Sequence, residues 1–323
     1  MMKQSAARAM LLALGLVLST PLAAQDYPSK PVRLIVPFAA GGPADMLARA
    51  IAPAISAALK QTVVIENKAG AGGAVGVDAV VKSQPDGHTI GLSGPGALVS
   101  VPFMTTVPYN VGRDIAPIAR VATVSGVIVA GPKSGFKSLA DLIAAAKARP
   151  GQVHFGSAGS GTTTHLAGEL LNMEAGIKLV HVPYRGAAPA LTDMLGGHVQ
   201  LMLPDLPAVI EQIRSGAVTG LALTSPDRSS FVPDLPTTTE LGFPRVISYS
   251  WYGLIAPAGT SASIRKRVHD AAMVALASPE VIKQIATLAG TPTPAGGEEF
   301  AALINDEQMK WKRVIEATGA KME

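Results

Sequence analysis

The sequence predicts an α/β protein with mostly parallel sheets and helices on both faces of each sheet. From residue 32 to the C-terminus, short apolar runs alternate with longer stretches of helical periodicity. Such alternation is typical of strand–helix–strand units, whose strands are parallel because each helix returns the chain to the same edge of the sheet. The chain has 323 residues, of which 48% are apolar and 15% charged, which is enough for one large or two medium domains with a core.

Eight runs have the composition of strands. They are residues 32–38, 62–67, 88–94, 153–159, 178–184, 199–203, 219–225 and 251–257. The first helical stretch follows at residues 44–60, where Leu47, Ile51, Ile55 and Leu59 recur at every fourth position. That spacing places the four side chains on one face of a helix.

Boundary residues mark a second helix and a helical C-terminus. Ser138 and Asp141 have the spacing of a capping box, and Pro150–Gly151 predicts where that helix stops. Residues 261–278 and 298–319 have helical composition. The sequence contains no tandem repeat or low-complexity linker between these elements.

The first 24 residues predict a cleavable secretory signal. Lys3 and Arg8 supply the positive start, residues 10–18 the apolar segment, and small residues lead to a cleavage site near Ala24. A membrane anchor is the alternative, but the apolar run is shorter than the roughly 20 residues that span a bilayer. The chain has no cysteine, which excludes both disulfides and a thioether-linked lipid at a new N-terminus. We therefore expect an exported mature chain without a transmembrane helix.

Charge and motifs argue against several classes of function. The formal net charge of +4 falls to +2 once the two cations of the N-terminal segment are removed, too little to predict nucleic-acid binding. No two histidines lie within five residues of each other, so metal-ligand spacing is absent and packing or surface roles are expected; the six are His88, His154, His165, His181, His198 and His269. We expect no metal and no cofactor.

Enzyme and nucleotide motifs are incomplete. Residues 155–161 have the small residues of a nucleophile elbow in the wrong order, and there is no cysteine nucleophile. Residues 70–76 follow a strand and precede a helix, but Val75 occupies the place of the third glycine in a dinucleotide-binding loop. The sequence therefore predicts a protein that is not an enzyme.

Two glycine-bearing loops are the remaining candidates for a binding site. Residues 38–45 and 156–165 each follow an apolar strand and enter a helix, where unpaired N–H groups attract an anion. Asp45 either takes part in this site or simply caps its helix. A helix N-terminus contributes only about 0.3–1 kcal/mol, whereas micromolar affinity needs about 8 kcal/mol. We therefore expect both loops to bind one ligand.

The sequence resembles the substrate-binding receptors of tripartite tricarboxylate transporters, also called Bug receptors, from about residue 26 to the C-terminus. The resemblance rests on six ordered motifs: YPSKPVRLIVPFAAGGPAD, VVIENKAGAGGAVGVDAV, PDGHTIGL, FGSAGSGTTTHLAGELL, HVPYRGAAPALTDMLGG and SWYGLIAPAGT. It implies a two-lobe periplasmic binding protein, of the type that closes like a flytrap about a hinge of crossing strands. Lobe I is expected to comprise residues 26–121 and 224–323, and lobe II residues 122–223.

The resemblance also implies the ligand and the site. A small carboxylate is expected in the cleft, held by backbone amides and hydroxyls rather than by cations, and handed to membrane permease subunits. The expected ligand-binding residues are Phe38, Ala40, Gly41, Gly42, Asp45, Ser93, Ser157, Gly159, Ser160, Gly161, Thr162, Thr163 and Asp205. Delivery to a signalling protein is an alternative, an exported enzyme is a weaker one, and a monomer that binds no nucleic acid is expected.

Two departures from the family pattern bear on the ligand and on the first helix. Pro204 and Asp205 stand where the family more often has an acidic residue and an asparagine. Asp205 either accepts a hydrogen bond from the ligand, repels a second carboxylate, or caps the helix that follows. Pro53 lies inside the first long helix, where we expect a kink. Trp251 and Tyr252 are expected in the core, with gating of the cleft as the alternative.

Overall fold

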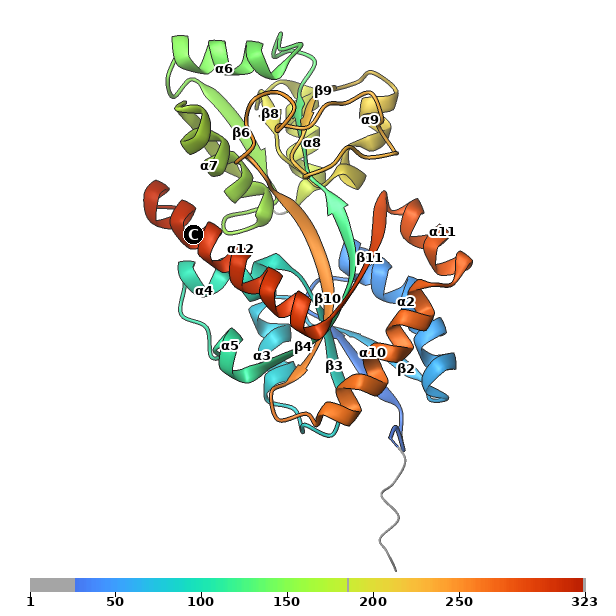
Figure 1. Cartoon of the computed structure of the whole chain (residues 1–323). Helices are drawn as coiled ribbons and strands as arrows, with labels where there is room; N and C mark the ends of the chain where they lie inside the picture. Colours follow the sequence, from blue (N-terminus) through green and yellow to red (C-terminus); the bar gives the residue numbers. More distant parts are fainter. Residues whose placement is uncertain (1–26, 185, 322–323) are drawn as a thin grey trace, which may run out of the picture.

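The computed structural model describes residues 27–184 and 186–321 and contains two sheets, each covered by helices (Figure 1). The predicted signal, residues 1–24, lies outside the described residues. The six-stranded sheet has the order β11-β4-β10-β3-β1-β2, and the five-stranded sheet has the order β7-β6-β8-β5-β9. The predicted α/β fold class is thereby confirmed. None of the helices in the described part of the chain is long and apolar enough to cross a membrane.

The six-stranded sheet is packed between helices on both faces. Its strands are β1 (Val32–Val36), β2 (Val63–Asn67), β3 (Thr89–Ser93), β4 (Ile115–Ser125), β10 (Tyr249–Pro257) and β11 (Gly290–Gly296). Leu34 and Leu92 face α2 (Pro43–Leu59) and α10 (Ala262–Leu276), whereas Trp251 faces α3 (Ala74–Val81) and α12 (Gly297–Thr318). The shorter helical elements here are η1 (Ala71–Gly73), the π-helical turn η2 (Gly96–Ser100), α4 (Val101–Met104), α5 (Val111–Asp114) and α11 (Pro279–Thr287).

The five-stranded sheet has the same layered construction. Its strands are β5 (Val127–Ala130), β6 (Val153–Ser157), β7 (Leu179–Pro183), β8 (Leu201–Met202) and β9 (Thr219–Leu223). Apolar side chains of α6 (Leu139–Ala148) and α7 (Thr163–Ala175) form one core with this sheet, and those of α8 (Ala187–Gly196) and α9 (Ile210–Arg214) form another. The 3-10 turn η3 (Leu206–Ala208) follows β8. Ser138 caps α6 by accepting the N–H of Asp141 at 3.1 Å, which confirms the predicted capping residue.

The expectation of mostly parallel sheets is wrong. β1 runs parallel to β2 and β3, and β6 parallel to β7 and β8, but five other strand pairings are antiparallel. The prediction missed β4, β5 and β11, which supply most of those antiparallel pairings. β4 is buried on both faces and contains Pro117, and β11 reads GTPTPAG, so neither shows the alternation that identifies a half-buried strand.

Two strands carry the chain between the sheets. β4 pairs with β10 over its full length, and after Gly126 the chain continues as β5 in the other sheet (Figure 1). At this crossing Thr224 donates its N–H to the Gly126 carbonyl at 2.9 Å, and Ser248 donates its N–H to the Thr224 carbonyl at 2.8 Å. A side chain at Gly126 would collide with Thr224 and Ser248. The three segments can meet at this point because Gly126 has no side chain.

The division of the chain into lobes stays a prediction. Gly126 lies between β4 of the six-stranded sheet and β5 of the five-stranded sheet. Within residues 224–248, Phe243 and Val246 pack in the core of the five-stranded sheet. We propose on these grounds that the segment 224–248 belongs with the second lobe rather than the first. Helix α2 continues through Pro53 to Leu59, and the kink there also stays a prediction.

Candidate functional site

The first loop joins β1 to α2 and is held by a buried carboxylate. Asp45 accepts hydrogen bonds from the Gly41 N–H at 2.8 Å, from Arg49 Nε at 2.9 Å and from Asn67 Nδ2 at 3.0 Å. Asn67 also donates to the Phe38 carbonyl at 3.1 Å. Asp45 is 1% exposed, and the bond from Arg49, helped by those from Gly41 and Asn67, lowers the pKa of its carboxyl to about 2. Asp45 therefore orders the loop from beneath the surface, and its contact with a ligand stays a prediction.

The N–H groups available in this loop belong to alanines. The Gly41 N–H is used by Asp45, and the Gly42 N–H points to the Ala39 carbonyl at 3.4 Å. The N–H groups of Ala39 and Ala40 have no hydrogen-bond partner among the described residues, and both residues are exposed. Gly41 has φ +82°, so the glycine gives the loop its path and the alanines present the donors.

The second loop joins β6 to α7 and is also internally bonded. The N–H groups of Ala158, Gly159 and Thr162 bond to Thr164 Oγ1 (2.9 Å), Ser157 Oγ (3.1 Å) and the Gly159 carbonyl (3.3 Å) respectively.

Gly161, with φ +78°, donates its N–H to His165 Nδ1 at 3.1 Å. Within the described chain, the N–H and hydroxyl groups of Ser160 and Thr163 have no such partner, which makes them the donors that this loop offers.

The turn η2 connects the two loops. Ser100 Oγ donates to the Gly161 carbonyl at 3.0 Å. At the other side of the turn, a Cβ at Gly73 would lie 3.2 Å from Ala97 Cβ and 3.4 Å from Phe38 Cζ, so Ala97 and Phe38 flank the same glycine. The turn η2, whose apolar residues belong to a core of the six-stranded sheet, thus bonds to the second loop and lies close to Phe38 of the first.

Ser93, at the end of β3, comes shortly before this turn. It is fully buried, and its hydroxyl has no hydrogen-bond partner among the described residues. Its contact with a ligand stays a prediction.

Asp205 lies at the crossing between the sheets. Its backbone forms a bridge with Gly126, and both its carboxylate oxygens lie 2.9 Å from Ser250 Oγ on β10. The side chain makes no capping bond to η3, so the capping interpretation is wrong. Burial raises the pKa of the Asp205 carboxyl to about 6, and among the described residues no Lys, Arg or His nitrogen lies within 4.0 Å of it.

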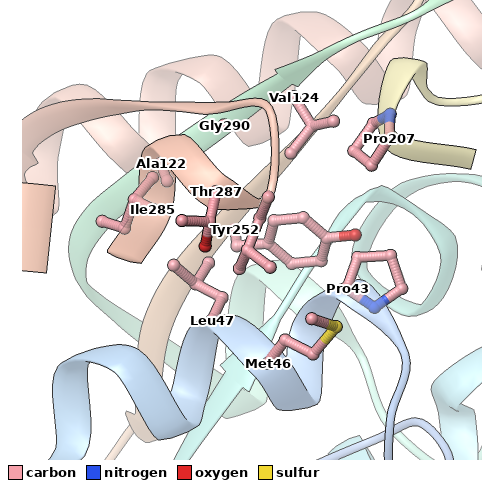
Figure 2. Close-up of a pocket in the computed structure, with 11 residues that line it drawn as sticks. Pro43, Met46, Leu47, Ala122, Val124, Pro207, Tyr252, Ile285, Thr287 and Gly290 are labelled. Atoms are coloured by element: carbon pink, nitrogen blue, oxygen red, sulfur yellow. The ribbon is translucent and has the colours of Figure 1, made fainter. Parts of the chain in front are cut away.

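An apolar cavity of about 200 Å³ lies beside this crossing (Figure 2). Pro43 and Met46 line it from α2, Tyr252 from β10, and Pro207 from the segment after β8. Figure 2 shows the Tyr252 ring among these side chains with its hydroxyl directed toward Pro43. None of the predicted site residues lines this cavity, although Pro43 ends the first loop.

The two adjacent aromatic residues of β10 lie in different surroundings. Trp251 is fully buried against Phe300, with ring centroids 5.4 Å apart, and belongs to the core as expected. Tyr252 lines the cavity, and burial and the nearby charge of Asp205 raise the pKa of its hydroxyl. The cavity therefore lies close to Asp205 at the crossing.

Sequence reasoning missed several residues that shape the loops. His165 is buried and His181 half-buried, in keeping with the expected packing role, but the sequence does not indicate that both contact the second loop. Asn67 ends β2 in register with Val36 of β1, so the adjacency of parallel strand ends was a usable signal. No signal in the sequence points to the Ser100–Gly161 or Ser250–Asp205 bonds.

Replacing Asp45 with asparagine tests the first loop. We expect Asp45→Asn to lower the free energy of unfolding by about 2 kcal/mol at pH 7, because it removes charge-assisted bonds. Because the pKa of Asp45 is depressed in the folded protein, the stabilisation that its charge provides is full above about pH 4. This stabilisation disappears as pH falls through about 2. Urea unfolding at pH 7 and pH 3 measures this difference, with Asp141→Asn, the same position on the exposed start of α6, as control. Equal stability of Asp45→Asn and the parent at pH 7 would contradict this role.

Comparison with known proteins identifies the family. Residues 47–320 match the model of the tripartite tricarboxylate transporter family receptor. The chain belongs to this receptor family. It is 39% identical to the protein BugT of Bordetella pertussis over 307 residues, which are 94% of each chain.

Solved structures of the same size share the receptor fold. A Rhodopseudomonas palustris protein, Rpa4515 with adipate, is 30% identical, with a TM-score of 0.82 over 92% of this chain and 100% of the other. MatC from the same organism, with bound malate, is 28% identical, with a TM-score of 0.79 over 90% and 100%. The predicted family and the two-lobe periplasmic binding protein fold are both confirmed.

Proposed function

We propose that this receptor captures a small dicarboxylate or related carboxylate between its two loops in the periplasm and delivers it to the membrane subunits of its transporter. The observation that carries the proposal is the arrangement of both loops. Each is internally bonded, and each leaves N–H groups that have no hydrogen-bond partner among the described residues, at Ala39, Ala40, Ser160 and Thr163. Preorganised neutral donors of this kind suit a carboxylate. Family relatives described with adipate and with malate support the same ligand class.

Capture requires that one ligand contact both lobes. A ligand favours a closed state only by binding it more tightly than the open one, and one loop offers too little free energy alone. The donors lie on loops attached to different sheets, and the strands β4 and β10 connect those sheets. Closure about this connection would bring both sets of donors to one carboxylate ligand. The receptor then acts by binding and release, with no catalytic step.

A thermal-shift screen of residues 25–323 tests the ligand class. The chain is purified in denaturant and refolded, so that carried ligand is removed. It is then heated with adipate, malate, aromatic acids and acidic amino acids, and with nucleotides and sugars as controls. Ligand at a thousand times its dissociation constant adds about 4 kcal/mol to stability, which raises the melting temperature by several degrees. A shift with nucleotides or sugars and none with carboxylates would overturn the proposal.

Delivery to a permease is tested separately from binding. The receptor, loaded with radiolabelled ligand, is added to vesicles that contain the permease subunits of its transporter. We expect uptake only when receptor and permease are both present. Binding without uptake would favour the alternative in which the loaded receptor presents its ligand to a sensor protein.

A further inference from the structure

Two histidines outside the proposed ligand contacts form a stacked pair against the second loop. His165 lies in the first turn of α7 and His181 in β7, with ring centroids 3.8 Å apart and planes inclined by 14°. Phe155 of β6 packs against His181, with centroids 5.1 Å apart. His165 is 5% exposed, and burial lowers the pKa of both imidazoles to about 4, helped at His181 by the neighbouring ring.

Each ring holds one part of the loop. His165 Nδ1 accepts the N–H of Gly161 at 3.1 Å, and His181 Nε2 lies 2.6 Å from Ser157 Oγ. Ser157 Oγ in turn accepts the N–H of Gly159 at 3.1 Å. Because His165 Nδ1 is an acceptor, the neutral ring carries its single proton on Nε2.

We propose that His165 and His181 are positioning residues that hold the second loop in its ligand-binding conformation, and that His165 does so only while its ring is neutral. A proton on His165 Nδ1 would face the Gly161 N–H, donor against donor, and that bond would break. Two stacked imidazolium rings would also repel each other. Gly161 would then be released from His165, and Ser160 and Thr163, the residues whose donors are offered to the ligand, lie on either side of Gly161 in the sequence.

The surroundings give a charged pair little compensation. Among the described residues, Glu169 of α7 is the acidic side chain near the rings, with Oε1 3.8 Å from His165 Nε2. Burial raises the pKa of Glu169, so its own charge is disfavoured, and it approaches the ring nitrogen opposite to the one that holds the loop. The other residues that contact His181 are Phe155 and Ser157 of β6. Ser100 of η2 contacts the loop itself, at the Gly161 carbonyl. None of these three side chains titrates near neutral pH.

The direction of the pH effect follows from the lowered pKa values. In the folded protein the loop is held at pH 7 and is released as pH falls through about 4. Unfolded histidines titrate near 6.5, so the free energy of unfolding already declines below that pH. The loop-holding role concerns the protein without ligand, whereas the pH dependence of binding rests on the proposed function.

Hydrogen exchange without ligand tests the first part. His165→Asn places an amide oxygen near the position of Nδ1 and does not titrate, whereas His165→Leu fills the ring's space without an acceptor. At pH 7 we expect His165→Leu to speed exchange at Gly161 at least tenfold, and His165→Asn to stay within about threefold of the parent. His154→Leu, on the half-buried His154 of β6, is the control and should change nothing at Gly161. Unchanged Gly161 exchange in His165→Leu would overturn the proposal.

Calorimetry with adipate and with malate at pH 7 and pH 3.5 tests the second part. The parent and His165→Asn encounter the same protonation of the ligand, so only the difference between them reports the histidine. We expect the parent to lose at least threefold more affinity on acidification, with circular dichroism checking the fold at each pH. Identical pH profiles would overturn the requirement for a neutral His165. If neither protein binds these two acids or any other carboxylate of the thermal-shift screen, the proposed ligand class fails. The exchange experiment still decides the role of the histidines.

Discussion

Gly161→Asp is expected to abolish carboxylate binding while the protein stays folded. Gly161 has φ +78°, lies buried between His165 and Ser100, and sits beside the N–H groups that the second loop offers. Aspartate there introduces a negative charge that repels a carboxylate and displaces both bonds. We expect at least a hundredfold weaker binding, equivalent to about 2.7 kcal/mol, in calorimetry with the acid selected by the thermal-shift screen.

Gly176→Asp is the matched control for this substitution. Gly176 caps the other end of α7 with φ +59°, and a Cβ there meets no atom within 4 Å. Both variants accept a comparable backbone strain, which aspartate tolerates better than most residues. Only Gly161→Asp should lose the ligand. A folded Gly161→Asp protein with parental affinity would remove the second loop from the binding site.

Asp205→Asn is expected to strengthen binding of dicarboxylates. With its pKa raised to about 6 by burial, the Asp205 carboxyl is mostly ionised at pH 7, and its side-chain partner among the described residues is the neutral Ser250 hydroxyl. We place it near the distal end of the ligand, where it would repel a second carboxylate. The amide keeps an acceptor for Ser250 and removes the charge, so we expect adipate and malate to bind at least tenfold more tightly at pH 7, about 1.4 kcal/mol.

The same substitution is expected to change stability with pH. The pKa of Asp205 is raised to about 6 in the folded protein, so the protonated carboxyl favours the folded state. This contribution to the free energy of unfolding is full below about pH 4 and is lost as pH rises through 6. Asp205→Asn should therefore gain about 2 kcal/mol relative to the parent between pH 4 and pH 7 in urea unfolding. The buried histidines titrate in this range with the opposite sign, and the difference between the two proteins cancels them.

Ser250→Ala gives the opposite control, because it leaves the carboxylate without its donor and should lower stability at pH 7. Loss of binding to every carboxylate in Asp205→Asn would contradict repulsion. That result would instead assign Asp205 to an ammonium or hydroxyl group of the ligand.

Residues close in sequence supported most of the correct predictions about the fold. The four-residue spacing of Leu47, Ile51, Ile55 and Leu59 placed a helix where α2 lies, and all four side chains are buried. Ser138 identified its helix start through a bond that spans three residues. Of the three strands that the prediction missed, β4 is buried on both faces and β11 contains two prolines, and each feature hides the alternation of a strand.

The candidate site was predicted only in outline. Both loops were located because a glycine turn between a strand and a helix is a local pattern. Which N–H groups remain available was not predictable, because Asp45, Asn67 and His165 use the glycine N–H groups or set the path of the loops. The Ser93, Ser160 and Thr163 contacts stay predictions until a ligand is bound.

Sequence patterns alone predict the α/β class and the two loops, because propensity and capping act over a few residues, and they predict the family because its motifs appear in order along the chain. The remaining features are visible only in the folded protein: the crossing at Gly126, the bond from Ser250 to Asp205, the stacked His165–His181 pair, and the bond from Ser100 to Gly161, 61 positions apart. These contacts join segments distant in the chain, and their geometry is set by how two sheets and their helices pack. No local spacing encodes such packing, so the second loop is held by residues such as Ser100 and His165, for which the sequence indicates no role in the site.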